Sequence, residues 1–389
     1  MQGENGGQKE PVRKVVIFRH NLFRISEPFI TQQAQQLQRY KPLYMGRLRF
    51  GEPPEGAESL ALQDLSPGWP LPRVGWQMIT RTPRPYQRLL KDRHPSLIHA
   101  HFGVEGVYAL PLAEQMQVPL VTTFHGFDAT LSTAALLCSP AWANYPLFRR
   151  RLARQGELFL CASSFIRDRV LAMGFPEERT QVHHIGVDCL AIQPRDSGEE
   201  TPAILHVARL VEVKGTNYLI RAFAALAQRR KDVQLVIIGD GPLRRPLQVL
   251  AKSLGLEQRV QFLGALPHRQ VLAWMRQAAM VVLPSVRTAS GRVEGLGMVM
   301  LEAAATGVPV IGSHLGGIPE GVIDCQTGFL VRERDVEALA GRMSELLDAP
   351  ATRLRMGTQG RALVERRFDI RRQTETLEKL YDSVLSNGK

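Results

Sequence analysis

The stretch Ala203-Ile-Leu-His-Val-Ala-Arg-Leu-Val-Glu-Val-Lys-Gly215 is the basis for predicting the fold. An apolar, β-branched run over 203–208 ends at Arg209, a turn carries Lys214 and Gly215, and an amphipathic run follows over 217–229. This order is typical of a buried parallel strand that leads into a crossover helix. The stretch therefore predicts one strand-turn-helix unit of an α/β sheet.

The same alternation continues on both sides of this stretch. Towards the C-terminus we expect strands at 233–239, 260–263, 280–283, 308–312 and 328–331, and helices at 243–254, 268–277, from about Gly297, 335–348, 352–366 and 369–385. Towards the N-terminus we expect strands at 14–19, 97–101, 119–124, 157–162 and 181–185, and helices at 27–39 (capped by Ser26), 104–115, 146–154 and 164–173. The pattern predicts two doubly wound, Rossmann-like α/β domains that face each other across a cleft.

Two polar segments separate parts of this pattern. The segment 51–72 is rich in Pro, Gly and acidic residues and predicts a surface loop. The segment 193–202 is polar, flanked by proline and without periodicity, and predicts a linker. The domains are therefore expected at 1–192 and 203–368.

Composition narrows the class of protein. With 389 residues, 44% hydrophobic and 22% charged, the chain is of ordinary globular composition, which excludes collagen-like and wholly disordered classes. No apolar run approaches the ~20 residues of a membrane span, and 1–13 lacks an apolar signal segment, so a cytosolic location is expected. Four scattered cysteines without zinc spacing predict neither a disulfide framework nor a structural metal.

The net charge of +12 suits anionic partners. No nucleic-acid reader motif accompanies this charge, so nucleic acid is not expected among them. A phosphorylated small molecule and an anionic membrane surface remain as partner classes.

A pair of carboxylates brackets a glycine turn in Glu294-Gly-Leu-Gly-Met-Val-Met-Leu-Glu302. Gly295 and Gly297 let the backbone approach a ligand, and the free amides of the following helix turn favour an anion. Glu302, two turns further on, is placed to accept bonds from hydroxyl groups such as those of a ribose. The alternative is a surface glutamate before an ordinary turn.

Two cations follow the strand 203–208. Arg209 and Lys214 lie after the carboxyl end of that strand and before a helix N-terminus, which predicts a clamp for a diphosphate. The alternative is a pair of solvated cations on a loop. A further strand-to-helix turn, Ile238-Gly-Asp-Gly-Pro242, contributes Gly239 and Gly241 as a weaker signal of the same kind.

In this order and spacing, the motifs resemble family 4 of the retaining nucleotide-sugar glycosyltransferases, which have the GT-B fold. The resemblance covers nearly all of the second half and rests on A-R-L-V-E-V-K-G (208–215), I-G-D-G-P (238–242), F-L-G (262–264), L-P-S (283–285), E-G-L-G-M-V-M-L-E-A (294–303), G-V-P-V-I (307–311), G-G-I-P-E (316–320) and G-F-L-V (328–331).

The resemblance implies a role for each matching position. Arg209 and Lys214 would hold the donor diphosphate, Glu302 the ribose, and Glu294 would lie beside the transferred sugar. The remaining donor contacts would come from the backbone at Leu296, Gly297, Met298, Gly239 and Gly241. The family implies no metal and no cofactor besides the nucleotide-sugar substrate, for which UDP is favoured over GDP or ADP on family frequency. It also implies that the final helix, 369–389, packs back on an acceptor-binding first domain.

The first half matches the family more loosely. Thr122-Thr-Phe-His-Gly-Phe-Asp128 implies His125 at the reaction centre and Asp128 as an acceptor contact, with a capped loop histidine as the alternative. Where many relatives carry a glycine-rich loop, this chain has Ser26-Glu27-Pro-Phe-Ile30, which resembles the branch that builds colanic acid and amylovoran. Ser26 and Glu27 are therefore assigned to the acceptor side. The inserted segment 286–293 also fits that branch.

Other histidines and basic clusters receive weaker interpretations. His99 and His101 share one face of a strand and are interpreted as structural or as lining the cleft, while His183 and His184 receive no function. Basic residues gather at 81–93 and at 149–154, where peripheral contact with an anionic membrane and a solvated helix face are both open.

The sequence thus predicts a glycosyltransferase that moves a sugar to a glycan or lipid-linked oligosaccharide in surface polysaccharide synthesis. The alternatives are a non-catalytic nucleotide-sugar-binding partner subunit and another GT-B chemistry, such as a sugar-nucleotide epimerase or a phosphorylase. A tandem Rossmann dehydrogenase is disfavoured because no G-x-G-x-x-G follows the first strand.

Overall fold

The computed structural model describes residues 12–24, 27–66, 68, 70–196 and 200–387. By its internal contacts the chain forms two compact units. The first comprises Met1–Thr122, Gln155–Leu158 and Thr374–Lys389, and the second comprises Thr123–Arg154 and Phe159–Gln373. Ser26, which the sequence assigns to the acceptor side and to a helix cap, lies outside the described residues. The domain boundaries expected from the sequence stay a prediction.

The first unit is built on parallel strands. Its order is β5 (Glu58–Ala61), β3 (Tyr40–Gly46), β1 (Arg13–Phe18) and β6 (Leu97–His101), and the same sheet continues through β7 (Leu120–Phe124), β8 (Leu158–Cys161) and β9 (Thr180–Val182). In β1, Val15 pairs with Pro42 on one side and with Leu97 on the other. Neighbouring strands thus pair with both edges of β1, and its apolar run is buried from Val15 to Phe18, as expected of a central parallel strand with both faces covered.

Part of the segment predicted as a loop is regular structure, so that prediction is wrong. Within 51–72 the chain forms β5 and a 3₁₀ turn (Leu62–Leu65), and β5 pairs in parallel with β3. Only Leu60 and Ala61 of β5 are buried, because it is a short edge strand. The two buried residues of β5 are adjacent in sequence, so the strand shows no period of two. The strand β3 and the helices α2 (Leu71–Thr80) and α3 (Arg84–Leu89) were also not identified from the sequence.

The second unit contains a six-stranded sheet. The strands are ordered β12 (Val260–Gly264), β11 (Gln234–Ile238), β10 (Thr201–Val207), β13 (Ala278–Leu283), β14 (Val310–Ser313) and β15 (Gly328–Val331), and all pairs are parallel. Successive residues of a strand enter different cores: Ile204 packs on one face, whereas Leu205 packs on the other. This alternation explains why the strands are apolar throughout, since both faces are covered.

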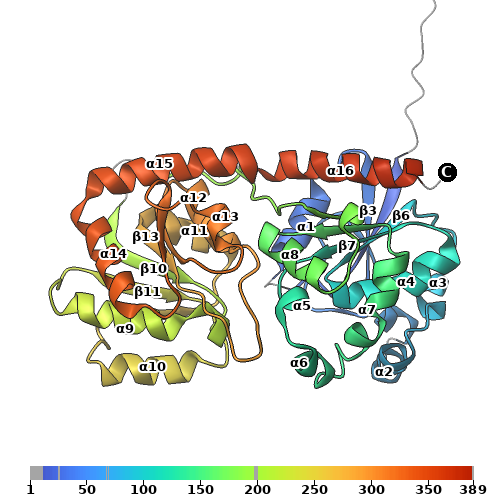
Figure 1. The fold of residues 1–389 in the computed structure, drawn as a ribbon, viewed down its shortest axis with the longest axis horizontal. Helices are drawn as coiled ribbons and strands as arrows, with labels where there is room; N and C mark the ends of the chain where they lie inside the picture. Colours follow the sequence, from blue (N-terminus) through green and yellow to red (C-terminus); the bar gives the residue numbers. More distant parts are fainter. Residues whose placement is uncertain (1–11, 25–26, 67, 69, 197–199, 388–389) are drawn as a thin grey trace, which may run out of the picture. The chain divides into compact units, whose positions relative to one another are not determined.

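Helices cover the two faces of this sheet, as Figure 1 shows. One face is covered by α9 (Thr216–Ala227), α10 (Arg244–Ser253) and α14 (Val336–Asp348), through side chains such as Phe223, Leu247 and Met343. The other face is covered by α11 (His268–Gln277), α12 (Met298–Ala305) and α13 (Ile318–Gly321), through Met275, Met300 and others. The sequence predicted this series of strands and its main helices within a few residues at each end.

The remaining helices complete the two units. They are α1 (Pro28–Gln35), α4 (Gly103–Met116), α5 (Phe127–Thr130), α6 (Thr133–Leu137), α7 (Asn144–Gln155), α8 (Ser164–Ala172), α15 (Pro350–Arg367) and α16 (Ile370–Asn387), with 3₁₀ turns at Glu177–Arg179 and Glu212–Lys214 and a small ribbon of β2 (Asn21–Leu22) and β4 (Leu48–Arg49). None of the helices in the described part of the chain is long and apolar enough to span a membrane.

The end of α16 belongs to the first unit. Glu378 Oε1 accepts the backbone amides of Gln38 and Arg39, at 2.8 and 2.7 Å. Tyr381 is fully buried, and its hydroxyl lies 2.5 Å from Nδ1 of His99. His99 is 1% exposed and its ring stacks on that of His101, so both histidines lie within the packed interior of this unit.

Candidate functional site

A lysine-glutamate ion pair lies at the centre of the predicted donor residues. Lys214 Nζ is 2.5 Å from Oε2 of Glu294, and the two side chains are 22% and 15% exposed. Ser285 Oγ donates to the same carboxylate oxygen at 3.4 Å. The ion pair joins residues 80 positions apart in the chain, which the sequence assigned separately to a diphosphate clamp and to the sugar.

The turn after β10 places Lys214. Residues Glu212–Lys214 form one turn of 3₁₀ helix, and Gly215 follows with a φ of +64°, from which α9 begins. A Cβ at Gly215 would lie 1.8 Å from the carbonyl oxygen of Pro284, the residue before Ser285. Glycine is therefore required both by the backbone angle and by the close approach of the β13 loop.

Gly239 and Gly241 hold the neighbouring turn in place. A Cβ at Gly239 would lie 1.9 Å from the carbonyl oxygen of Ala208, and one at Gly241 would lie 2.4 Å from that of Leu210. These two carbonyls flank Arg209, whose side chain is exposed. The glycines after β11 thus let two loops pack backbone to backbone and support the segment that carries Arg209; their predicted contact with the donor stays a prediction.

A third cation in this region was missed by the sequence analysis. Burial and the nearby Arg209 guanidinium lower the pKa of Arg292 from its ordinary value, and the attraction of Glu294 opposes them. Arg292 lies two residues before Glu294, in a segment that the sequence analysis noted only as an insertion. Arg292 therefore interacts electrostatically with both Glu294 and Arg209, while Lys214 pairs with Glu294 directly.

The helix α12 begins at the predicted glycine turn. Gly297 has a φ of +82° and directly precedes Met298, the first helical residue, and as a glycine it provides no side chain to cap this helix end. The Leu296 side chain is buried in an apolar cluster with Leu301 and Phe368, which anchors the turn. The first backbone amides of α12 therefore have no capping side chain from Gly297, and amides at a helix start favour an anion.

Glu302 has a partner that the sequence analysis did not identify. Its Oε1 lies 2.9 Å from Nε2 of His268, the first residue of α11. The hydrogen bond to Glu302 raises the pKa of His268 above its ordinary value, against the effect of burial. The predicted ribose ligand is therefore held in place by a titratable side chain.

The loop that carries His125 packs directly against the loop that carries Glu294. Gly126 lies against the backbone of Gly295, and a Cβ at Gly295 would lie 2.0 Å from the carbonyl oxygen of His125. Asp128 is 1% exposed, and its Oδ1 accepts the amides of Gly126 at 2.9 Å and His125 at 3.3 Å. The carboxylate thereby holds the His125 loop in shape; its predicted contact with the acceptor stays a prediction.

A second pair of glycines supports the Glu294 loop from another direction. A Cβ at Gly316 would lie 2.2 Å from the carbonyl oxygen of Glu294, and one at Gly317 would lie 1.9 Å from that of Gly295. Ser163 Oγ donates to the same Gly295 carbonyl at 2.7 Å. These contacts show why the G-G-I-P-E motif accompanies the paired glutamates, although the sequence analysis gave it no role.

Glu320, the last residue of that motif, contacts α8 and His184. Its Oε1 accepts the amide of Ser164 at 2.6 Å, and its Oε2 lies 2.8 Å from Nε2 of His184. Burial opposes ionisation of Glu320, but the bonds from His184 and from the amides of Ser164 and Phe165 lower its pKa below the ordinary value. His184 received no function from the sequence, whereas in the structure it forms a half-buried hydrogen-bonded pair with Glu320.

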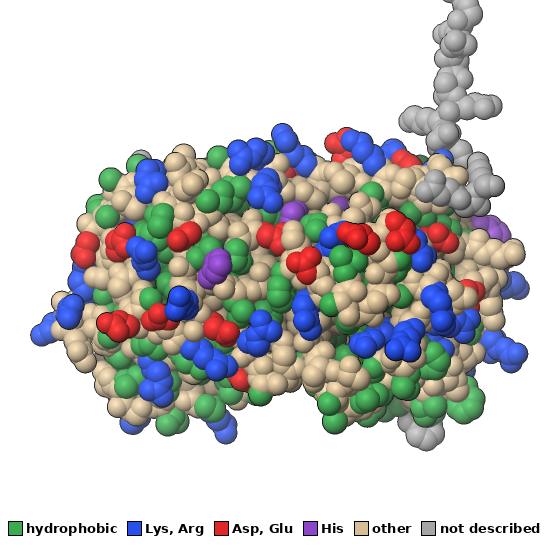
Figure 2. Space-filling model, in the orientation of Figure 1, with side chains coloured by type: hydrophobic (Ala, Val, Ile, Leu, Met, Phe, Trp, Pro, Cys, Tyr) green, Lys and Arg blue, Asp and Glu red, His purple; other side chains and the backbone are tan. Residues whose placement is uncertain are grey.

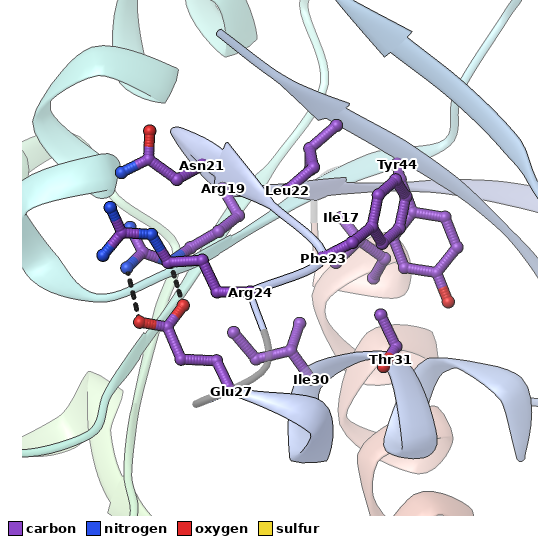
Figure 3. Close-up of a pocket in the computed structure, with 10 residues that line it drawn as sticks. All are labelled: Ile17, Arg19, Asn21, Leu22, Phe23, Arg24, Glu27, Ile30, Thr31 and Tyr44. Atoms are coloured by element: carbon purple, nitrogen blue, oxygen red, sulfur yellow. Dashed lines mark hydrogen bonds and ion pairs between the residues drawn. The ribbon is translucent and has the colours of Figure 1, made fainter. Parts of the chain in front are cut away.

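On the first unit, Glu27 lines a small pocket (Figure 3). Its carboxylate accepts two bonds from Arg19, from Nε at 2.9 Å and from a terminal guanidinium nitrogen at 3.0 Å. Arg19 also pairs with Glu105 and is 7% exposed. Arg24, Asn21 and Thr31 are among the other polar residues that line the pocket.

No group of three or more His, Cys, Asp or Glu side chains in the described ranges is arranged to hold a metal ion. The absence of a metal requirement stays a prediction, to be tested with a chelator.

Two family models together match most of the chain. Residues 191–363 match the family described as glycosyl transferases group 1, and residues 48–189 match glycosyltransferase family 4. Among solved structures, the sucrose-phosphate synthase of Thermosynechococcus elongatus superposes with a TM-score of 0.77 at 20% identity, over 96% of this chain and all of the other. Anabaena Alr3699/HepE, solved with UDP and glucose, gives a TM-score of 0.75 at 20% identity, over 95% of this chain and all of the other. Likeness at this identity establishes the fold, and the predicted GT-B class is confirmed.

Two sequence relatives belong to the predicted branch. A provisionally assigned colanic acid biosynthesis glycosyltransferase, WcaL of Escherichia coli (strain K12), is 36% identical over 63% of this chain and 60% of its own length. The chain thus spans less than two thirds of that relative. The amylovoran biosynthesis glycosyltransferase AmsK of Erwinia amylovora is 33% identical over 72% of this chain and 69% of its own length. With these relatives and both family models matched, the chain belongs to glycosyltransferase family 4.

Proposed function

We propose that this protein transfers a sugar from a nucleotide-sugar donor, with UDP favoured as the nucleotide, to a glycan or lipid-linked oligosaccharide in exopolysaccharide biosynthesis. The names of the two relatives support the pathway. The observation that carries the proposal is the Lys214–Glu294 ion pair, which precedes the start of α12 and whose carboxylate also attracts Arg292.

The chemistry of sugar transfer matches this distribution of charge. Breaking the bond between the anomeric carbon and the diphosphate oxygen leaves negative charge on the leaving group and positive charge on the sugar. Arg209, Lys214 and the first amides of α12 would stabilise the leaving diphosphate, and Glu294 would lie beside the cationic sugar. Groups that are already oriented for this charge lower the barrier without reorganising during the reaction.

The ion pair also explains how the cations of the site are stabilised when no donor is bound. Arg209 and Arg292 repel each other, and the Glu294 carboxylate, which attracts Arg292 and pairs with Lys214, offsets part of that repulsion while no donor is bound. When a diphosphate arrives, Lys214 would turn from the carboxylate to the phosphate oxygens. Glu294 would then be released towards the sugar, while Glu302 would exchange its bond with His268 for the ribose hydroxyls.

The acceptor side and the stereochemistry follow from the family resemblance. We assign His125 to the reaction centre, and Asp128 and Glu27 to the acceptor side. We expect retention of the anomeric configuration, by attack of the acceptor hydroxyl on the same face that the diphosphate leaves. In that step the acceptor oxygen bonds to the anomeric carbon, the donor C–O bond breaks, and the leaving phosphate oxygen takes the acceptor proton.

The first experiment is a binding panel with UDP, GDP, ADP and their common sugars, with and without EDTA. A selective shift in melting temperature with one nucleotide, unchanged by EDTA, would support a metal-independent donor site. Transfer with the selected donor would then be followed by NMR, where an anomeric configuration equal to that of the donor supports retention. Donor turnover without any acceptor would indicate an epimerase, and tight donor binding without turnover would indicate a partner subunit.

A further inference from the structure

The helix α2 presents apolar side chains to solvent. Leu71, Trp76 and Ile79 are 64%, 63% and 77% exposed, and they are among the most exposed large apolar residues of the described chain. At 100° per residue, these positions and the intervening Gly75 fall on one side of the helix. Figure 2 shows hydrophobic side chains on the surface over the position that α2 has in Figure 1. An amphipathic helix normally buries such a face.

The opposite face of α2 is held by polar contacts. Gln77 is fully buried, and its Oε1 accepts a bond from Nε of Arg47 at 2.8 Å. The carbonyl of Met78 accepts the hydroxyl of Tyr108 at 2.9 Å, and Val74 packs inwards at 7% exposure. These contacts fix the rotation of the helix, so its apolar face points outwards in the folded state.

Cations directly follow the apolar face. The basic cluster identified at 81–93 in the sequence is divided in the structure. Arg81 is buried and donates to the Val107 carbonyl at 2.9 Å, and Arg93 pairs with Glu58. Arg84 and Arg88, four residues apart on α3, and Lys91 after it, are exposed, and none of these three forms an ion pair with a described residue.

We propose that α2 and α3 bind the surface of an anionic lipid bilayer. Leu71, Trp76 and Ile79 enter the interface between headgroups and acyl chains, and Arg84 and Arg88 contact anionic headgroups. An exposed apolar face with a tryptophan beside basic residues is the pattern of an interfacial helix. The proposal rests on the proposed function, because a lipid-linked acceptor would present its sugar at such a surface.

The test is co-sedimentation of the full-length protein with vesicles of phosphatidylcholine alone or with 30% phosphatidylglycerol. We expect binding to the anionic vesicles that weakens with salt. Each basic residue near the surface contributes about 1 kcal/mol, so Arg84→Gln with Arg88→Gln should weaken the partition about 25-fold. Trp76→Ser with Ile79→Ser should weaken it at least about 10-fold.

The matched control is Val249→Ser with Leu354→Ser, which removes two apolar residues of similar exposure, 67% and 65%, from the second unit. It should bind vesicles like the wild type. Loss of binding in the control, or unchanged binding in the Trp76/Ile79 variant, would overturn the proposal. A concentration-dependent dimer in sedimentation velocity that the Trp76/Ile79 variant abolishes would likewise overturn it and assign the face to a second copy of the chain.

Two further measurements separate this proposal from the proposed function. UDP affinity and transfer to a short water-soluble acceptor should be equal in the Trp76/Ile79 variant and the wild type, because α2 carries none of the assigned site residues. If vesicle binding behaves as expected while no nucleotide binds, the membrane surface stands and the assigned donor site fails. If nucleotide binds and vesicles do not, the reverse holds.

Discussion

Replacing Gly295 with alanine tests whether the geometry between the His125 and Glu294 loops matters for transfer. Gly295 does not have a positive φ, so only space opposes a side chain at this position. Its Cβ would lie 2.0 Å from the carbonyl oxygen of His125, whereas real Cβ atoms essentially never approach closer than 3.0 Å. One backbone segment must therefore move by about 1 Å. Gly317 and Ser163 support the Glu294 loop from the other side and limit where it can move.

A misplacement of about 1 Å at a reaction centre can reduce the rate ~100-fold. We therefore expect Gly295→Ala to lower kcat/KM for transfer about 100-fold, while overpacking lowers the free energy of unfolding by about 1–3 kcal/mol. UDP affinity should change less than kcat/KM, because Arg209 and Lys214, which lie on a different loop, would keep their share of the diphosphate contacts. Steady-state transfer, isothermal titration with UDP and urea denaturation would measure the three quantities.

The matched control is Gly341→Ala on α14, where nothing lies within 4 Å of the added Cβ. This variant should keep full activity and gain about 0.5–1 kcal/mol of stability, because glycine is unfavourable inside a helix. Wild-type turnover by a folded Gly295→Ala protein would refute the argument that the two loops must meet at this distance.

Three further predictions concern the donor site. Glu294→Ala should reduce turnover at least about 100-fold while changing the free energy of unfolding by only about 1–2 kcal/mol, since the Lys214 side chain is 22% exposed and is not left as a fully buried charge; near-normal turnover would exclude the assigned role. Lys214→Ala removes a charge-assisted bond worth about 1.5–3 kcal/mol, so the Kd for UDP should rise about 10- to 100-fold in a titration, whereas Lys252→Ala, at an exposed ion pair, should leave it unchanged. The pKa of His268 is raised, so below pH 6.5 His268 is protonated and binds the Glu302 carboxylate most firmly. As the pH rises through the raised pKa, His268 loses its proton and its hold on Glu302 weakens. UDP affinity should therefore increase as the pH rises from 6.5 through the pKa of His268, and His268→Gln should make UDP affinity independent of pH in this range. If His268→Gln has the same pH dependence of UDP affinity as the wild type, Glu302 does not bind the ribose.

The order of the strands and main helices of the six-stranded sheet, and the kinds of residue in its loops, could be predicted from the sequence alone. Apolar runs such as β10 and β13 are buried on both faces of the sheet, and amphipathic helices separate them in sequence. The alternation of strands and helices can therefore be recognised from residues that are close in the sequence. The family motifs contain the glycines that the close backbone approaches require. Arg209, Lys214, Glu294 and Glu302 could therefore be assigned before any contact was known.

Which of these residues come into contact depends on the three-dimensional fold. Lys214 and Glu294 are separated by 80 positions and pair because β10 and β13 are neighbours in the sheet. Strand order depends on long-range packing, which local periodicity does not contain. For the same reason Arg292 was missed, and His184 received no function although it pairs with Glu320.

Helix α2 shows most directly what the local sequence pattern does not predict. Periodicity in a sequence can separate the apolar side of a helix from its polar side, but it does not state which side the protein buries. In α2 the buried side is held by Gln77 and its bond to Arg47, whereas Trp76 and Ile79 face solvent. The direction of a face is decided by the elements that pack against it, and these come from distant parts of the chain.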